Sequence, residues 1–214
     1  MVGGIYGGGT IFKISPSGTL TTLYSFCAQS GCADGNVPNT GLVLATDGNF
    51  YGTTYLGGAN SCMISGTNYG CGTVFKITPS GTLTTLYSFC AQSGCADGEG
   101  PRAGLVQATN GKLYGTTYYG GPTGDGTVFS LAVGLGPFVE TRPTSGVVGR
   151  FVEILGTNLT GATSVTFNGT PATFKVVSRY LITTTVPTGA TTGKVEVVTP
   201  SGTLSSNVPF RVLP

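Results

Sequence analysis

The chain consists of short runs of apolar and β-branched residues that are separated by glycine-rich turns. The run Thr82–Phe89 (TLTTLYSF) alternates apolar with hydroxyl-bearing side chains, which is typical of a strand covered on one face and partly covered on the other. Its threonine content disfavours a helix. Turn sequences at Asp47-Gly48 and Pro79-Ser80-Gly81 separate neighbouring runs. Four runs therefore predict a four-stranded antiparallel meander: Gly41–Thr46, Asn49–Tyr55, Gly72–Thr78 and Thr82–Phe89.

This unit is repeated, because the twenty residues Pro16–Gly35 recur without change at Pro79–Gly98. Tandem four-stranded units are typical of β-propeller blades, and a propeller closes with about four to eight of them. The chain supplies only about two and a half such units. Three runs precede the central unit and three follow it: Gly3–Gly7, Gly9–Ser15 and Thr19–Phe26 before it, and those within Gly104–Leu131 after it.

An array with so few units leaves strand edges unpaired, and such edges are templates for pairing with another chain. Three interpretations stay open. The chain is a fragment of a longer array, or copies complete one another in an oligomer or fibre, or the units form another β-architecture. Each interpretation directs attention to the edges of the array.

The repeat sequence ends before Gly134-Leu135-Gly136-Pro137, which predicts a domain boundary. We expect a propeller-like β-repeat domain at residues 1–134 and a second domain at residues 137–214. The predicted fold class is all-β throughout. Six short runs in the second domain have the spacing of an immunoglobulin-like sandwich: Phe151–Leu155, Ser164–Phe167, Thr173–Val177, Leu181–Val186, Lys194–Val198 and Val208–Val212.

Both segments resemble known families. The sequences GLVLATDGNFYGTTYLGG and GTVFKITPSGTLTTLYSF are similar to the GloVer or "choice-of-anchor" tandem repeats of exported bacterial proteins, over about residues 3–133. The sequences PTSGVVG, ILGTNLTGATSVTFNG and LITTTVPTGATTGKVEVVTPSG resemble an IPT/TIG immunoglobulin-like domain, over about residues 138–213. The resemblance implies a secreted or surface protein. One departure from regular repetition is the insertion Ala59–Cys71.

The charge pattern narrows the range of partners. Charged residues are only 8% of the chain, and the formal net charge is +2. Because no basic stripe is present to neutralise phosphates, we expect no binding to nucleic acid. No apolar run approaches the roughly 20 residues of a membrane-spanning helix, so we expect no membrane insertion. A surface with so few charges repels its own copies weakly, which favours self-association.

The cysteines fall in three local pairs: Cys27 with Cys32, Cys62 with Cys71, and Cys90 with Cys95. An even number of close pairs in polar loops predicts disulfides. A metal site is the alternative, but the chain has no histidine and no CxxC-like spacing. Disulfides persist in oxidising compartments, so we expect an extracellular or cell-surface location.

Catalytic chemistry has little support. The absence of histidine excludes histidine-based triads and histidine-bound metals. Asp34 and Asp97, which follow cysteine pairs, are expected to cap the backbone of their own loops. Calcium ligation is the alternative for these residues, although no DxDxDG loop is present. We predict no enzyme activity and no cofactor.

Tyrosines beside glycine-rich loops are the remaining candidates for an interaction surface: Tyr51, Tyr55, Tyr114, Tyr118 and Tyr119. Such side chains fill the core between units, contact a neighbouring subunit, or stack on sugar rings. The absence of tryptophan disfavours sugar binding.

These observations favour a non-enzymatic extracellular structural or adhesive protein that self-associates through open strand edges into a surface assembly or filament. Its expected partners are other copies of the chain. The alternative is a cell-surface binding module that recognises glycan or protein through its Tyr- and Gly-rich loops, with the immunoglobulin-like domain as a stalk.

Overall fold

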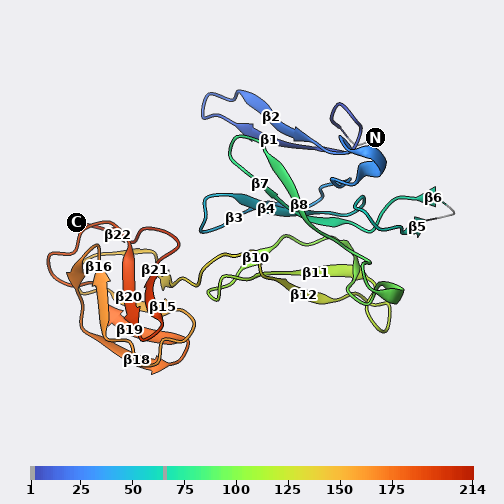
Figure 1. Ribbon diagram of the computed structural model, residues 1–214. Coiled ribbons are helices and arrows are strands. Elements are labelled where there is room, and N and C mark those ends of the chain that lie inside the picture. Colours follow the sequence, from blue (N-terminus) through green and yellow to red (C-terminus); the bar gives the residue numbers. More distant parts are fainter. Residues whose placement is uncertain (1–2, 65–66) are drawn as a thin grey trace. The chain divides into compact units, whose positions relative to one another are not determined.

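The computed structural model describes residues 3–64 and 67–214 and is built from strands (Figure 1). Within these residues the helical segments are two short 3-10 turns, η1 (Ser30–Cys32) and η2 (Ser93–Cys95). The all-β prediction is confirmed. The chain divides into two compact units. The first, called the repeat unit because it contains the strands of the repeats, runs to Gln107 and includes Leu113–Val133. The second, the C-terminal unit, consists of Ala108–Lys112 and Gly134–Pro214.

The central unit of the array is a four-stranded antiparallel sheet, here called repeat sheet 2. Its order is β3 (Val43–Leu44), β4 (Phe50–Thr54), β7 (Thr73–Ile77) and β8 (Leu83–Ser88). Gly48 and Gly81 adopt positive φ angles of 78° and 96° in the turns, a conformation that glycine takes without strain. The predicted meander is therefore confirmed.

The insertion between β4 and β7 forms a separate hairpin. Its strands are β5 (Met63–Ile64) and β6 (Thr67–Asn68), which pair antiparallel. Residues 65 and 66 of the insertion lie outside the described residues.

Incomplete sheets flank the central one. Repeat sheet 1 has two strands, β1 (Thr10–Ile14) and β2 (Leu20–Ser25). Repeat sheet 3 has the order β10 (Val106–Gln107), β11 (Leu113–Tyr119) and β12 (Val128–Leu131), and β9 (Glu99–Pro101) also pairs with β11. The prediction of a strand at Gly3–Gly7 is wrong. This segment turns instead, with positive φ at Gly4 and Gly7.

The duplicated sequence folds twice in the same way. The hairpin β1–β2 pairs Ile11 with Tyr24 and has a register shift before Phe12. The hairpin β7–β8 pairs Val74 with Tyr87 and has the same shift before Phe75. Because the two hairpins lie in different surroundings yet share this irregularity, the local sequence determines it.

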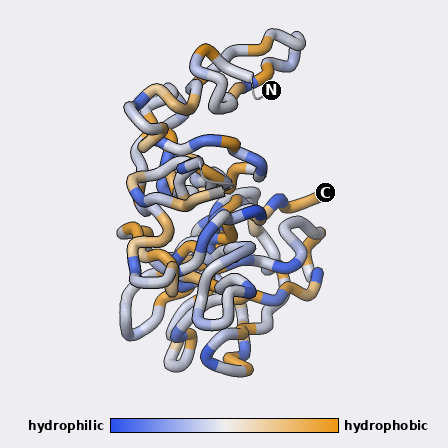
Figure 2. Tube along the Cα trace, turned by 90° about the vertical axis from the view of Figure 1, so that its right-hand side faces the viewer, coloured by the Kyte–Doolittle hydropathy of each residue, from blue (hydrophilic) through white to orange (hydrophobic). Residues whose placement is uncertain are grey.

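Apolar contacts between consecutive sheets form the core of the repeat unit. Repeat sheets 1 and 2 share a cluster of buried side chains: Ile11, Phe26, Phe75 and Ile77. The rings of Phe26 and Phe75 meet edge to face with centroids 5.2 Å apart. Phe89 and Phe129 repeat this contact between repeat sheets 2 and 3, at 5.0 Å. Figure 2 shows apolar positions, in orange, that recur along the trace and continue into the segment near the N-terminal label.

The C-terminal unit is a sandwich of two four-stranded sheets. One sheet has the order β13 (Glu140–Arg142), β15 (Phe151–Leu155), β19 (Leu181–Thr185), β18 (Phe174–Ser178), and the other β17 (Thr170–Pro171), β16 (Ser164–Phe167), β20 (Val195–Thr199), β21 (Gly202–Ser205). Two short strands, β14 (Ser145–Gly146) and β22 (Arg211–Val212), pair in parallel.

Alternation along the strands builds the core of this sandwich. Val195 and Val197 of β20 are buried, whereas Glu196 and Val198 between and beside them are exposed. The buried positions of both sheets join in one cluster that includes Val152, Ile154 and Phe167. The predicted immunoglobulin-like sandwich is confirmed.

The two copies of one phenylalanine offer a direct test of packing between the sheets. Phe75 is 1% exposed and its equivalent Phe12 is 56% exposed. We expect Phe75→Ala to lower the free energy of unfolding of the repeat unit by about 3 kcal/mol, because it removes a buried ring and leaves a cavity. Phe12→Ala should cost less than about 1 kcal/mol. Urea denaturation followed by circular dichroism measures both, and equal losses would contradict the assignment of the core.

Candidate interaction surface

The loops closed by disulfides are braced from inside by an aspartate. In the first loop, Asp34 accepts hydrogen bonds from the Tyr24 hydroxyl (2.9 Å) and from the backbone amides of Ala28 (3.0 Å) and Gln29 (3.2 Å). In the second loop, Asp97 accepts the equivalent bonds from the Tyr87 hydroxyl (2.7 Å) and from the backbone amides of Ala91 (3.0 Å) and Gln92 (3.1 Å). These aspartates therefore cap their loops, as the sequence predicts, and their oxygens are engaged by donors.

The three predicted cysteine pairs are present as disulfides. The Sγ atoms of Cys62, Cys90 and Cys95 lie within 4.8 Å of one another, the spacing of a metal-binding cluster. All three sulfurs are engaged in disulfides, and a disulfide sulfur is not a thiolate ligand. The cluster is therefore a contact between two cross-links.

Three buried or partly buried tyrosines whose hydroxyls donate to aspartates resist ionisation. Burial and the hydrogen bond to Asp34 raise the pKa of Tyr24 to about 12. Burial and hydrogen bonds to Asp47 and Asp97 do the same for Tyr51 and Tyr87, again to about 12. The pKa of the Asp97 carboxyl is lowered: burial opposes this shift, and the bonds from Tyr87 and from the loop amides outweigh it.

The tyrosines predicted as a surface do not form one group. Tyr51 is 1% exposed and donates to Asp47 (2.9 Å), so it belongs to the core and its assignment to a surface is wrong. Tyr114 is partly buried in β11. Tyr118 and Tyr119 are exposed, and their rings meet edge to face at 4.6 Å. Tyr55 is partly buried.

An arginine that the sequence reasoning missed stacks on two of these tyrosines, Tyr55 and Tyr118. The Arg102 guanidinium carbon lies 4.4 Å from the ring centroid of Tyr55 and 4.5 Å from that of Tyr118. We call Tyr55, Arg102, Tyr118 and Tyr119 the Tyr–Arg cluster. The signal for it lay in the alignment of the repeats, because Arg102 occupies the position that Asn39 holds in the first copy. A planar cation stacked on exposed rings is suited to anionic or hydroxyl-rich ligands.

The two ends of the array expose apolar faces that are buried within it. The leading face, on repeat sheet 1, consists of Phe12, Ile14 and Leu20, which are 56%, 64% and 58% exposed. In repeat sheet 2 the equivalents of the first two, Phe75 and Ile77, are 1% and 0% exposed. Within the part of the chain that the structure describes, no sheet covers the leading face.

The trailing face, on repeat sheet 3, consists of Val106 and Val128. Val128 is 80% exposed, whereas its equivalents Val74 and Ile11 are 0% and 6% exposed because a following sheet covers each of them. A contrast of this size at equivalent positions identifies the trailing face as the surface that a further sheet would cover.

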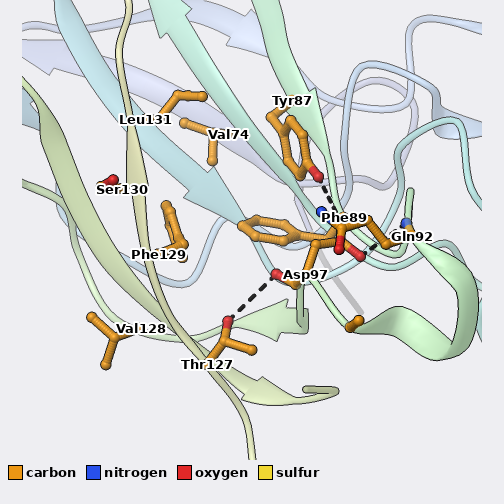
Figure 3. A pocket seen from close by; sticks show the side chains of 11 residues that line it. Val74, Tyr87, Phe89, Gln92, Asp97, Thr127, Val128, Phe129, Ser130 and Leu131 are labelled. Carbon is orange, nitrogen blue, oxygen red and sulfur yellow. Dashed lines mark hydrogen bonds between the residues drawn. The ribbon is translucent and has the colours of Figure 1, made fainter. Parts of the chain in front are cut away.

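A hollow lies beside the open edge of β12. It has a volume of about 360 Å³ and is lined by side chains from repeat sheets 2 and 3, including Val74, Phe89, Phe129 and Leu131. Figure 3 shows the rings of Tyr87, Phe89 and Phe129 among the side chains that line this hollow, together with Leu131 and Val74. Within the described residues no strand pairs with β12 on the edge opposite β11.

Comparison with known families agrees with this architecture. A sequence model of the Gloeobacter/Verrucomicrobia repeat matches residues 1–170, most of the chain. The chain belongs to this family. A second model, of the IPT/TIG domain, matches residues 139–212 of this Gloeobacter/Verrucomicrobia repeat protein. No curated protein matches the sequence.

The two families and the disulfides indicate an extracellular or surface protein. Repeat and immunoglobulin-like domains of this kind are typical of non-enzymatic proteins. Among the residues that the structure describes, no helix has the length and hydropathy to cross a bilayer.

Alkaline titration tests the tyrosine–aspartate pairs. Since the folded-state pKa of Tyr24, Tyr51 and Tyr87 is about 12, above the unfolded value of about 10, the folded chain keeps protons that the unfolded chain loses. The free energy of unfolding should therefore fall as the pH rises from about 10 to about 12.

Tyrosinate absorbance reports the individual groups. Asp97→Asn should move the late ionisation of Tyr87 back towards pH 10, since it removes the charge that opposes tyrosinate formation. Asp125→Asn, at an exposed position, is the control and should leave the late phase unchanged. An unaltered late phase in Asp97→Asn would argue against the pair.

Proposed function

We propose that this chain is a non-enzymatic structural or adhesive protein that self-associates head to tail through its open strand edges and uncovered faces, forming a surface assembly or filament. One observation carries the proposal: Val128 is 80% exposed at a position where the repeat otherwise buries valine or isoleucine almost completely. A sheet of a second copy that covers Val128 would restore the burial that Val74 and Ile11 have inside the array.

The internal contacts serve as the template for contacts between chains. Phe75 packs on repeat sheet 1 with Phe26, and Phe129 packs on repeat sheet 2 with Phe89. Phe12, the equivalent of both Phe75 and Phe129, is 56% exposed, and no sheet within residues 3–64 and 67–214 covers it. An interface between two different faces of one molecule is heterologous, and it continues as a filament unless the rotation closes it into a ring.

Electrostatics favour this association. With a net charge of +2 and only 8% charged residues, two copies face little mutual repulsion. The trailing face and the hollow beside it are bordered by hydroxyl, aromatic and aliphatic groups, with Asp97 engaged by its own loop. Burial of apolar surface is thus the main driving force, at roughly 25 cal/mol for each Å².

Sedimentation velocity over a range of concentrations tests the self-association. The wild-type chain should form species heavier than its 21.6 kDa mass as concentration rises. Val128→Lys should weaken association at least about tenfold, because it places a charge in the interface. Val177→Lys, at a residue that is 51% exposed in the C-terminal unit, is the matched control and should associate as the wild type does. A wild-type chain that stays monomeric throughout would refute the proposal.

A second candidate function rests on the Tyr–Arg cluster, which suits recognition of an acidic glycan on a cell surface. Exposed rings stack on sugars, and a guanidinium binds carboxylate or sulfate groups in a planar, bidentate manner. The C-terminal unit would then act as the stalk.

Binding to a glycan array tests whether the Tyr–Arg cluster recognises acidic glycans. Tyr118→Ala and Arg102→Ala should abolish binding to acidic glycans. Tyr180→Ala provides the control, because Tyr180 is 48% exposed and also carries a stacked arginine, Arg179 at 4.5 Å, in the C-terminal unit. Absence of glycan binding by the wild-type chain, or loss in all three variants alike, would dismiss the cluster as a glycan site.

A further inference from the structure

The two ends of the array carry complementary parts of one sheet. β1 and β12 occupy the same position in the repeat as β7, since Thr10-Ile11-Phe12 and Thr127-Val128-Phe129 correspond to Thr73-Val74-Phe75. In repeat sheet 2, β7 lies between β4 and β8. Among the described residues, β1 pairs with the equivalent of β8 alone, and β12 pairs with the equivalent of β4 alone.

The strand that β12 lacks is present in the chain in duplicate. β2 and β8 have the same sequence, Leu-Thr-Thr-Leu-Tyr-Ser. In repeat sheet 2, Leu83 of β8 lies opposite Ile77 and packs on the buried cluster between repeat sheets 1 and 2. At the equivalent place beside Leu131 there is instead the hollow of about 360 Å³. Leu20, the counterpart of Leu83 in β2, is 58% exposed.

We propose that β12 of one copy displaces β1 of the next copy as the partner of β2. The resulting shared sheet has the order β10, β11, β12 and then β2 of the second copy. This inference rests on the proposed self-association and names the strands at which copies join. The β7–β8 register places Leu131 opposite Leu20, Ser130 opposite Thr21 and Phe129 opposite Thr22.

The exchange releases β1, but β2 keeps one antiparallel partner, now β12 of the other copy, and gains contacts with the sheet to which β12 belongs. β2 leaves a two-stranded hairpin, which has little stability of its own, and joins a sheet that already has β10 and β11. Leu20 of the second copy would enter the hollow, whose lining includes Phe129 and Leu131 (Figure 3). Repeat sheet 2 of the second copy follows its own β2 and then covers Val128 as it covers Ile11, which is 6% exposed.

Side-chain chemistry also favours the replacement. β12 has the neutral Ser130 where β1 has Lys13, so the shared sheet has one charge fewer at its surface. Thr127, directly before β12, and Phe129 within it repeat the Thr-x-Phe sequence that β2 already faces in β1. The replacement of β1 by its counterpart β12 is related to domain swapping, in which protomers exchange identical elements at low cost.

Cross-linking between two variants tests the strand pair. A mixture of Ser130→Cys and Thr21→Cys chains should form a disulfide-linked heterodimer, because directly opposed residues in an antiparallel pair meet the geometry of a disulfide. Thr22→Cys, one residue further along β2 and on its other face, is the matched control and should give at least about tenfold less product. Non-reducing electrophoresis and peptide mapping identify the linkage. Equal yields from both mixtures would overturn the register.

A locked variant separates this inference from self-association in general. Lys13 pairs with Thr21 within one chain, so Lys13→Cys/Thr21→Cys should tie β2 to its own β1 and prevent exchange. We expect the locked variant to sediment as a monomer and Lys13→Ser/Thr21→Ser to associate as the wild type does. If the locked variant associates normally, the strand exchange is refuted while self-association stands. If the wild type is monomeric at every concentration, both fail.

Discussion

Burial of both faces of each repeat sheet is the constraint on which the repeat unit depends. Val74 turns to the following sheet and Phe75 to the preceding one, so that repeat sheet 2 is apolar on both sides. One sheet cannot satisfy this requirement alone, and stacking of consecutive sheets satisfies it only for the members inside the array. The edge-to-face pairs of Phe26 with Phe75 and of Phe89 with Phe129 are the visible outcome. The exposed apolar residues of the leading and trailing faces are the places where this burial is missing.

The connections between sheets are held by polar groups. Each duplicated loop is closed by a disulfide between nearby cysteines. Its aspartate accepts three hydrogen bonds, one of them from a tyrosine near the end of the preceding strand. The hydroxyl fixes the loop to the sheet, and the amides fix the loop to itself. Because both loops have identical sequences, they leave their sheets in the same conformation, with positive φ angles at Cys27 and Cys32 that recur at Cys90 and Cys95. A repeat of this kind transfers its geometry from one sheet to the next.

Much of this architecture could be predicted from the sequence, because alternation and turn chemistry are local. The central meander, the sandwich and the cysteine pairs follow from patterns within a few residues. The failures have a common cause. Tyr51 and Tyr114 hold the same position in the repeated sequence YGTTY, yet Tyr51 in repeat sheet 2 is 1% exposed whereas Tyr114 in repeat sheet 3 is only partly buried, a difference that the local pattern does not contain. The strand expected at Gly3–Gly7 failed because glycines with positive φ turn the backbone there. Arg102 acquires its role only where Tyr55 and Tyr118 approach in space.

The small disulfide loops have a consequence for the lifetime of the protein outside the cell. Residues 28–31 are exposed and lie between Cys27 and Cys32, and residues 91–94 lie in the same way between Cys90 and Cys95. Exposed polar loops are the usual sites of proteolytic nicking. A protease that cleaves inside either ring cuts the backbone but leaves the two products joined through sulfur. These two exposed loops are thus sites at which a single cut releases no fragment.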